Sequence, residues 1–158
     1  MKRIMISGTN SGCGKTTVVC ALLKALSERS IDVGAFKCGP DYIDPMFHSK
    51  IIGTKSYNLD SYFCPAGTLN YLLKKNSADM NIIEGAMGYY DGLGGTSATA
   101  SAWHLADTLG LPVLLVDCGL TDEGRRAAAL LSDMNTKLLT PQELAAYYTE
   151  ENTTEQGR

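Results

Sequence analysis

Short, strongly apolar runs recur along the chain as far as about residue 118, and each ends at glycine or at a charged residue. Their length and composition predict four buried strands, at residues 3–7, 32–37, 81–84 and 112–117. Between them, apolar residues at helical spacing predict helices at residues 15–28, 46–52, 65–76 and 97–109. Strands that are apolar on both faces and alternate with helices form a parallel sheet covered by helices on both faces, so we expect that α/β fold.

Breaker residues give the boundaries of these elements. Pro65 begins the third helix, and Gly110 ends the fourth. The segment 38–60 is rich in Gly, Pro and Asp, so we expect a loop there, interrupted only by the short helix. A glycine-rich loop is expected from the end of the third strand to about Gly95. Two long loops therefore follow the second and third predicted strands.

Structural signals weaken beyond residue 117. Residues 124–134 can form a helix, and Thr140 with Glu143 forms a capping box for another helix that ends near Tyr148. The residues 150–158 are polar and acidic, and we expect them to be disordered. We therefore expect one domain at residues 1–149, followed by a tail at residues 150–158.

Composition narrows the class of protein. A net charge of −3 and a pI near 5.3 argue against a general nucleic-acid binder, which would carry a basic face. No stretch approaches the ~20 apolar residues of a membrane span, and the N-terminus lacks the apolar region of a signal peptide. Five scattered cysteines without a C-x-x-C pair are typical of reduced thiols. The sequence therefore predicts a cytoplasmic protein with neither membrane nor nucleic acid as a partner.

A glycine-rich segment follows the first strand and opens the first helix. In this context it predicts a P-loop, whose backbone N–H groups point at phosphate oxygens while the helix N-terminus adds partial positive charge. Lys15 would reach the outer phosphates of ATP, and Thr16 would offer its hydroxyl to Mg²⁺. One position departs from the general pattern, because Thr9 stands where a glycine is usual. The predicted nucleotide-binding residues are Gly8, Thr9, Asn10, Ser11, Gly12, Cys13, Gly14, Lys15, Thr16 and Thr17.

Two further polar clusters follow predicted strands, where the ligands of open parallel sheets bind. The first, at residues 37–45, offers a cation, two carboxylates and a phenol. The second, at residues 84–92, begins at Glu84, which ends an apolar strand and is well placed to hold Mg²⁺ directly or through water. The two histidines, His48 and His104, have no ligand-like spacing, so a metal held by histidine is not expected.

Four motifs occur in a fixed order along the chain. They are the Gly-Thr form of the P-loop ending in Gly-Lys-Thr, GPDYIDP at residues 39–45, YNLD at 57–60, and EGAMGYYDG at 84–92. Together they resemble the N-terminal synthetase domain of the cobyrinate a,c-diamide synthase family over residues 2–118. The relation of that family to dethiobiotin synthetase accounts for Thr9. The resemblance implies an ATP- and Mg²⁺-dependent ligase that converts two corrinoid acetate side chains into amides during cobalamin synthesis, with ammonia taken from glutamine.

This implied reaction makes chemical sense of the polar clusters. A carboxylate is a poor electrophile, so ATP must first convert it to an acyl phosphate, which ammonia then attacks. Transfer of the γ-phosphoryl group needs charge neutralisation and in-line positioning. The resemblance thus implies Mg²⁺ ligands at Thr16, Asp44 and Glu84. It implies catalytic or substrate-orienting roles for Lys15, Lys37, Asp41, Tyr42 and Asp91.

The sequence departs from the family pattern after about residue 118. In that family a glutaminase domain follows, with a cysteine nucleophile on a sharp turn and a partner histidine. No cysteine here lies in a Gly-x-Cys-x-Gly turn, so we expect ammonia from a separate glutaminase or from solution. The synthetase domain also stops early, so we expect a truncated sheet whose unpaired edge favours a homodimer or a partner chain.

Alternatives stay open at this point. Nickel-sirohydrochlorin a,c-diamide synthase shares the overall pattern, so the sequence leaves the tetrapyrrole undecided. A nucleotide-dependent switch of the cell-division and partitioning type carries a second lysine where this chain has Asn10. The GPDYIDP and EGAMGYYDG loops argue against dethiobiotin synthetase. An inactive fragment is the remaining alternative.

Overall fold

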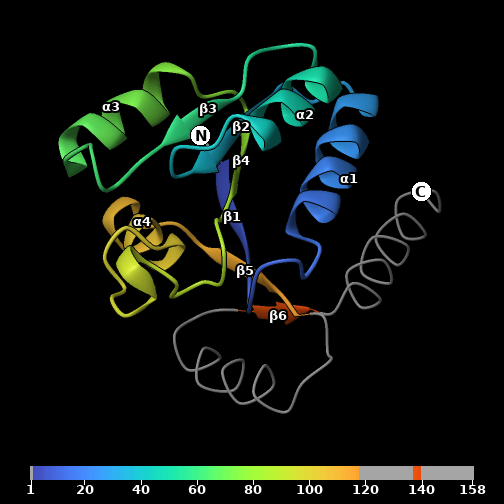
Figure 1. Ribbon diagram of the computed structural model, residues 1–158. Coiled ribbons are helices and arrows are strands. Elements are labelled where there is room, and N and C mark those ends of the chain that lie inside the picture. The colour runs from blue at the N-terminus through green and yellow to red at the C-terminus, as the bar shows by residue number, and fades with distance from the viewer. Residues whose placement is uncertain (1, 118–136, 140–158) are drawn as a thin grey trace.

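The computed structural model describes residues 2–117 and 137–139 and shows a single parallel sheet in this part of the chain (Figure 1). The strand order is β3-β2-β4-β1-β5-β6, and every neighbouring pair is parallel. The strands are β1 (Lys2–Gly8), β2 (Val33–Cys38), β3 (Tyr57–Leu59), β4 (Met80–Glu84), β5 (Val113–Val116) and β6 (Lys137–Leu139). The predicted α/β class and all four predicted strands are confirmed.

Helices cover both faces of the sheet. Figure 1 shows α1 (Lys15–Glu28) and α2 (Ile43–Ile52) on one side, and α3 (Ala66–Lys75) and α4 (Ala102–Leu109) on the other. Successive side chains of a strand point to opposite faces. Accordingly, Ile82 and Ile83 of β4 are both fully buried but belong to different apolar clusters, the first with Leu23 of α1 and the second with Leu105 of α4. The core is therefore split into two layers by the sheet.

The segment between β2 and α3 differs from the expected loop. Helix α2 begins at Ile43, three residues before the predicted start at residue 46. The Asp41 carboxylate accepts a hydrogen bond from the Ile43 amide (2.9 Å) and so closes a turn directly before the helix. Pro45 is tolerated there, since the first turn of a helix has no intrahelical use for its missing N–H. The three-residue strand β3 was also not expected. Its pairing with β2, rather than its own pattern, makes it a strand.

The C-terminal half of the described chain shows two further differences. Helix α4 begins at Ala102, not at residue 97, because Ser101 caps it by accepting a hydrogen bond from the His104 amide (3.1 Å). Gly110 ends the helix in the left-handed conformation, as predicted. Strand β6 was not expected. The helices predicted at residues 124–134 and 140–148, the tail at 150–158 and Cys118 lie outside the described residues.

The strand order decides which strand ends become neighbours. Strand β4 lies between β2 and β1, so Glu84 is in register with Lys37 on one side and with Ile6 on the other. Because all strands are parallel, the loops after β1, β2 and β4 leave the sheet at the same edge. Both polar clusters and the glycine-rich loop identified in the sequence are thereby gathered in one place.

One finding bears on membranes. In the described part of the chain, none of the helices combines the length and apolarity that a membrane crossing needs.

Candidate active site

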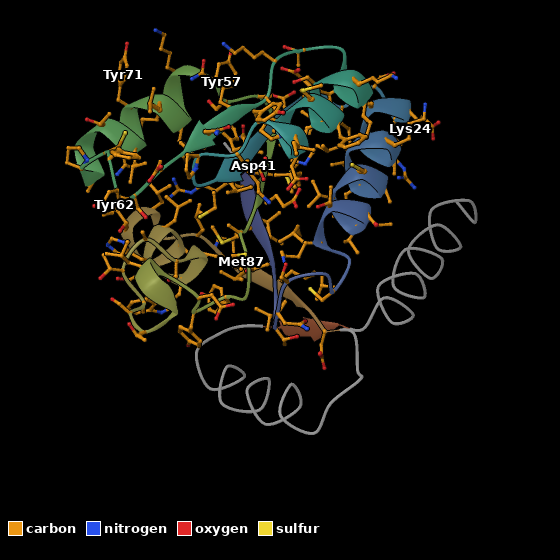
Figure 2. The ribbon with its side chains drawn as sticks, in the orientation of Figure 1. Lys24, Asp41, Tyr57, Tyr62, Tyr71 and Met87 are labelled. Carbon is orange, nitrogen blue, oxygen red and sulfur yellow. The ribbon has the colours of Figure 1, made fainter. Side chains whose placement is uncertain are left out.

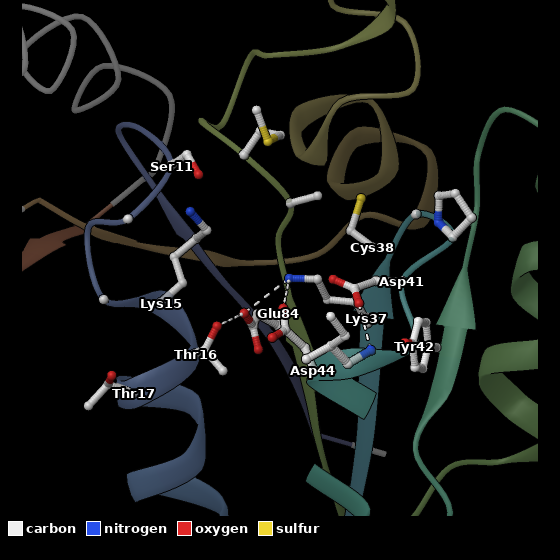
Figure 3. A pocket seen from close by; sticks show the side chains of 17 residues that line it. Ser11, Lys15, Thr16, Thr17, Lys37, Cys38, Asp41, Tyr42, Asp44 and Glu84 are labelled. Carbon is white, nitrogen blue, oxygen red and sulfur yellow. Dashed lines mark hydrogen bonds and ion pairs between the residues drawn. The ribbon is translucent and has the colours of Figure 1, made fainter. Parts of the chain in front are cut away.

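A cavity of about 590 Å³ opens at the carboxyl edge of the sheet. Its walls come from the P-loop and the first turn of α1, from the loop between β2 and α2, and from the residues that follow β4 (Figure 3). Figure 2 shows Asp41 in the middle of the molecule and Met87 beneath it, whereas Lys24 lies on the outer side of α1. The cavity therefore joins the three segments that the sequence singled out.

The P-loop takes a shape that only particular residues permit. Gly12 and Gly14 have φ angles of 78° and 95°, which an L side chain rarely adopts. At Gly8 the constraint is space, because an added Cβ would lie 2.2 Å from the Cys13 sulfur. The small residues thus allow the loop to fold back over the end of β1.

Lys15 occupies the position expected of a phosphate-binding cation. Its stem is buried against Gly8, and its ammonium donates to the Asn10 carbonyl (2.9 Å) while lining the cavity. Ser11, Gly12, Gly14, Thr16 and Thr17 of the predicted set also line the cavity. Gly8, Thr9, Asn10 and Cys13 lie outside the cavity lining and support the loop.

The loop after β4 and the end of β5 hold the P-loop from behind. The Tyr89 amide donates to the Gly8 carbonyl (2.8 Å), and the Thr9 hydroxyl donates to the carboxylate of Asp117 (3.0 Å). Thr9, the residue that departs from the general pattern, therefore ties the loop to β5. Burial of the Tyr89 phenol raises its pKa to about 12.

Glu84 is the centre of a buried polar cluster. Its Oε1 accepts hydrogen bonds from Thr16 Oγ1 (2.7 Å) and from Lys37 Nζ (3.0 Å). The Lys37 ammonium also donates to Asp44 Oδ2 (2.6 Å) and to the Gly85 carbonyl (3.0 Å), so its three N–H donors are all used. The structure thus brings together four of the predicted site residues.

The charges in this cluster support one another. Burial alone would raise the pKa of Glu84, but the hydrogen bond from His48 and the charge of Lys37 outweigh it and lower that pKa to about 2. Burial alone would lower the pKa of Lys37, but the charge of Glu84 and the hydrogen bond to Asp44 raise it. Glu84 is therefore ionised and Lys37 protonated at neutral pH.

His48 is the functional candidate that the sequence analysis missed. It is fully buried, and its Nε2 lies 2.7 Å from Glu84 Oε2. His48 and Asp44 are four residues apart on α2, a spacing that places two side chains on one face of a helix. That signal was hidden because the helix was predicted to start after Asp44.

The remaining predicted residues differ in whether they line the cavity. Asp41 and Tyr42 line the cavity, with Tyr42 74% exposed. Asp41 also shapes the loop, since its carboxylate accepts from the Ile43 amide and its carbonyl from the Asn58 side chain. Asp91 does not line the cavity. It is exposed, and its carboxylate accepts a hydrogen bond from the Gly88 amide (2.8 Å).

The oxygen donors at the cavity suit Mg²⁺. Thr16, Asp44 and Glu84 offer one hydroxyl and two carboxylates, and Mg²⁺ is usually bound through one or two carboxylates, phosphate oxygens and water. Within residues 2–117 and 137–139, no group of three or more His, Cys, Asp or Glu side chains is arranged to hold a metal alone. The hydroxyl and the two carboxylates match the kinds of ligand that Mg²⁺ uses together with phosphate oxygens and water.

A comparison with protein-family models gives a match over residues 4–144. The matching family is described as the CobQ/CobB/MinD/ParA nucleotide binding domain. The match spans the P-loop and both acidic loops.

Curated relatives named cobyrinate a,c-diamide synthase are similar to most of this chain. The one from Clostridium tetani is 47% identical over 116 residues, which is 73% of this chain and 26% of the relative. The one from Fusobacterium nucleatum is 41% identical over 141 residues, which is 89% of this chain and 30% of the relative. The chain therefore spans less than a third of the length of these relatives.

Solved structures share the fold at low sequence identity. The hydrogenase maturation factor HypB from Archaeoglobus fulgidus has a TM-score of 0.58 and 13% identity, covering 98% of this chain and 90% of its own. The signal recognition particle receptor FtsY from Elizabethkingia anophelis has a TM-score of 0.57 and 16% identity, covering 88% and 49%. At such identities the likeness is one of fold alone.

Proposed function

The chain belongs to the CobQ/CobB/MinD/ParA nucleotide binding domain family, and from that premise we propose that it is the ATP-dependent half of an amide-forming ligase. Its substrates are the acetate carboxylates of a corrinoid, and the proposed outcome is amidation of the a and c side chains in cobalamin synthesis. The names of the relatives support this choice of substrate.

One observation carries the proposal. The P-loop cation Lys15 and a second buried cation, Lys37, line the same cavity, and the acidic residues Asp44 and Glu84 line it with them. A site that only binds nucleotide needs the first cation. A site that transfers a phosphoryl group to a carboxylate must also neutralise a second anion, and Lys37 is placed to do so.

The residues divide the work by position. When bound, ATP supplies the phosphoryl group and Mg²⁺ neutralises charge on it. Lys15 binds the outer phosphates, and the hydroxyl of Thr16 with the carboxylates of Asp44 and Glu84 provides the oxygen ligands of the metal. Attack of the substrate carboxylate on the γ-phosphoryl group gives an acyl phosphate and ADP. Ammonia then displaces phosphate to form the amide.

Lys37 must release one partner before it can contact an incoming carboxylate, because its three donors are already used. The Asp44 carboxylate is the partner nearest to solvent, with its side chain 19% exposed against 0% for Glu84. We therefore infer that Lys37 exchanges Asp44 for the substrate carboxylate and keeps Glu84. Asp41 and Tyr42, at the outer wall of the cavity, contact the substrate. Asp91, which does not line the cavity, holds the loop after β4 by accepting a hydrogen bond from the Gly88 amide.

Ammonia has two sources under this proposal. A glutaminase domain outside the 158 residues supplies it from glutamine, or free ammonia enters from solution. The chain is expected to use ammonium and not glutamine when it is assayed alone.

The test supplies the chain with a corrinoid acid whose carboxylates carry ¹⁸O, together with Mg-ATP and ammonium. The expected result is amidated corrinoid, with ADP and with ¹⁸O transferred to inorganic phosphate, because the acyl phosphate passes one carboxylate oxygen to the phosphoryl group. ATP hydrolysis without ¹⁸O transfer, or no amide, would overturn the proposal. Parallel reactions with glutamine in place of ammonium and with nickel-sirohydrochlorin in place of the corrinoid test the source of ammonia and the tetrapyrrole.

A matched pair of variants links the result to the cavity. Lys37→Ala removes the second buried cation, and Lys24→Ala removes an exposed one that pairs with Glu28 on the outer side of α1. Charged hydrogen bonds are worth about 1.5–3 kcal/mol, so Lys37→Ala should lower kcat/KM for the corrinoid by at least about tenfold. Lys24→Ala should leave it unchanged.

A further inference from the structure

A line of buried hydrogen bonds runs from the cavity into the core. Glu84 Oε2 lies 2.7 Å from His48 Nε2, and the other ring nitrogen of His48 lies 3.3 Å from Ser56 Oγ. The Ser56 hydroxyl in turn donates to the Ala35 carbonyl of β2 (3.1 Å). His48 and Glu84 are fully buried and Ser56 is 5% exposed. The line therefore connects β4, α2 and β2 without reaching solvent.

The two oxygens of Glu84 have separate partners. Oε1 accepts hydrogen bonds from Thr16 and Lys37, which line the cavity, whereas Oε2 lies against the His48 ring. His48 itself does not line the cavity. The direct contact of His48 with a cavity residue is its hydrogen bond to the carboxylate of Glu84.

We propose that His48 is a positioning residue, which holds Oε2 of Glu84 so that Oε1 stays directed at Thr16 and at a divalent cation bound there. The proposal rests on the proposed function in that Glu84 is taken as a metal ligand. Ser56 supports His48 in this role, because its hydroxyl lies between the other ring nitrogen of His48 and the Ala35 carbonyl of β2.

Physical reasons favour this role over that of a space-filling residue. A buried polar ring costs free energy that an apolar side chain of the same size would avoid, so its partners must compensate. A glutamate has three side-chain torsions, and hydrogen bonds on both carboxylate oxygens remove most of that freedom. Groups that orient a metal ligand in this way often change metal affinity by about 10–100-fold when they are lost.

The test uses two amide variants that differ in reach. His48→Gln places its amide near the position of Nε2 and can still donate to Glu84. His48→Asn places its amide near the position of Nδ1, so it can still contact Ser56 but cannot reach Glu84. Both variants keep a polar amide in the buried site, and urea unfolding of each measures the cost of the smaller side chain separately from Mn²⁺ binding.

The measurement is the affinity of the full 158-residue chain for Mn²⁺ in the presence of a non-hydrolysable ATP analogue, followed by the EPR signal of free Mn²⁺. His48→Asn is expected to weaken Mn²⁺ binding by about tenfold or more, and His48→Gln to stay close to wild type. Affinity for the nucleotide with EDTA should be the same in all three proteins. Equal Mn²⁺ affinity in His48→Asn and wild type, equal loss in both variants, or no Mn²⁺ binding by wild type would overturn the proposal.

A third variant covers the case in which His48→Asn does not fold, which circular dichroism would reveal. Ser56→Ala leaves His48 in place but frees its far side, and it should weaken Mn²⁺ binding in the same direction. Unchanged binding in a folded Ser56→Ala protein would then overturn the proposal. The proposed amidation can fail while these affinities still follow the expected order, so the two ideas are tested separately.

Discussion

The ionised carboxylate of Glu84 is stabilised by the groups around it in the folded chain. The stability of the fold therefore depends on pH through this group. Its pKa in the folded chain is about 2, against an ordinary value of 4.5. A group with a lowered folded pKa stabilises the fold above its unfolded pKa and loses that contribution as pH falls toward the folded pKa. The stabilisation by Glu84 should therefore be complete above about pH 5 and decline below it.

Replacement of Glu84 by glutamine should remove this dependence. In urea unfolding with EDTA present, the wild-type free energy of unfolding should fall between pH 5 and pH 2 by on the order of 3 kcal/mol more than that of Glu84→Gln. Glu28→Gln serves as the control, because Glu28 pairs with Lys24 at an exposed site. Parallel curves for wild type and Glu84→Gln would contradict the prediction.

Gly8 makes a second prediction at the scale of single residues. A methyl group at Gly8 would lie 2.2 Å from the Cys13 sulfur and 3.1 Å from the flexible stem of Lys15. Gly8→Ala should therefore destabilise the chain by about 1–3 kcal/mol through overpacking. Combining it with Cys13→Ala removes the sulfur, so the double variant should recover part of the loss in chemical denaturation. Strictly additive losses would argue against the contact.

At the scale of elements, the local sequence pattern indicated that a helix is present more accurately than it indicated the residue at which the helix begins. The apolar spacing and Gly110 indicated the fourth helix correctly, but Ser97 and Ser101 offer similar capping chemistry. Only the packed structure selects Ser101, which is 1% exposed and also donates to the Ala98 carbonyl (2.6 Å). The helix begins where the cap can be buried.

This choice of cap can be measured. Ser101→Ala should lower the free energy of unfolding by about 1 kcal/mol, since it removes the acceptor for the His104 amide. Ser97→Ala changes an exposed residue that accepts a hydrogen bond from the nearby Thr99 amide, and it should have a smaller effect. Thermal or chemical unfolding of the two variants decides the matter. A larger loss for Ser97→Ala would favour the helix start expected from the sequence.

At the scale of the whole molecule, the described sheet ends in two short strands, β3 and β6. Strands at the end of a sheet present unpaired backbone groups, which favour pairing with another chain. Tyr62 and Phe63, which follow β3, are 56% and 72% exposed and add apolar surface near that end. We therefore keep the prediction that the chain forms a homodimer.

Light scattering across a micromolar concentration series tests the prediction. A mass that rises toward twice 17.0 kDa with concentration is expected. A constant mass of one chain over the whole series would contradict it.

The sequence by itself determined the P-loop, the parallel α/β class and the gathering of Asp41, Asp44 and Glu84 at one edge of the sheet. The P-loop is a local feature, because a strand, a glycine-rich turn and a helix start follow one another within residues 2–28. The common site follows from the fold class, because all strands of a parallel sheet end at one edge. The family motifs then identified Lys37, Asp44 and Glu84 as candidates. Which of them touch was left undecided.

The tertiary structure alone decided those contacts. Lys37 and Glu84 are 47 residues apart, and they meet because β4 inserts between β2 and β1 in a register that no local pattern encodes. His48 showed no ligand-like spacing, yet packing of α2 against the sheet brings its ring within hydrogen-bond distance of Glu84. Burial then gives these contacts their strength, since charges removed from water depend on the few partners that the fold provides.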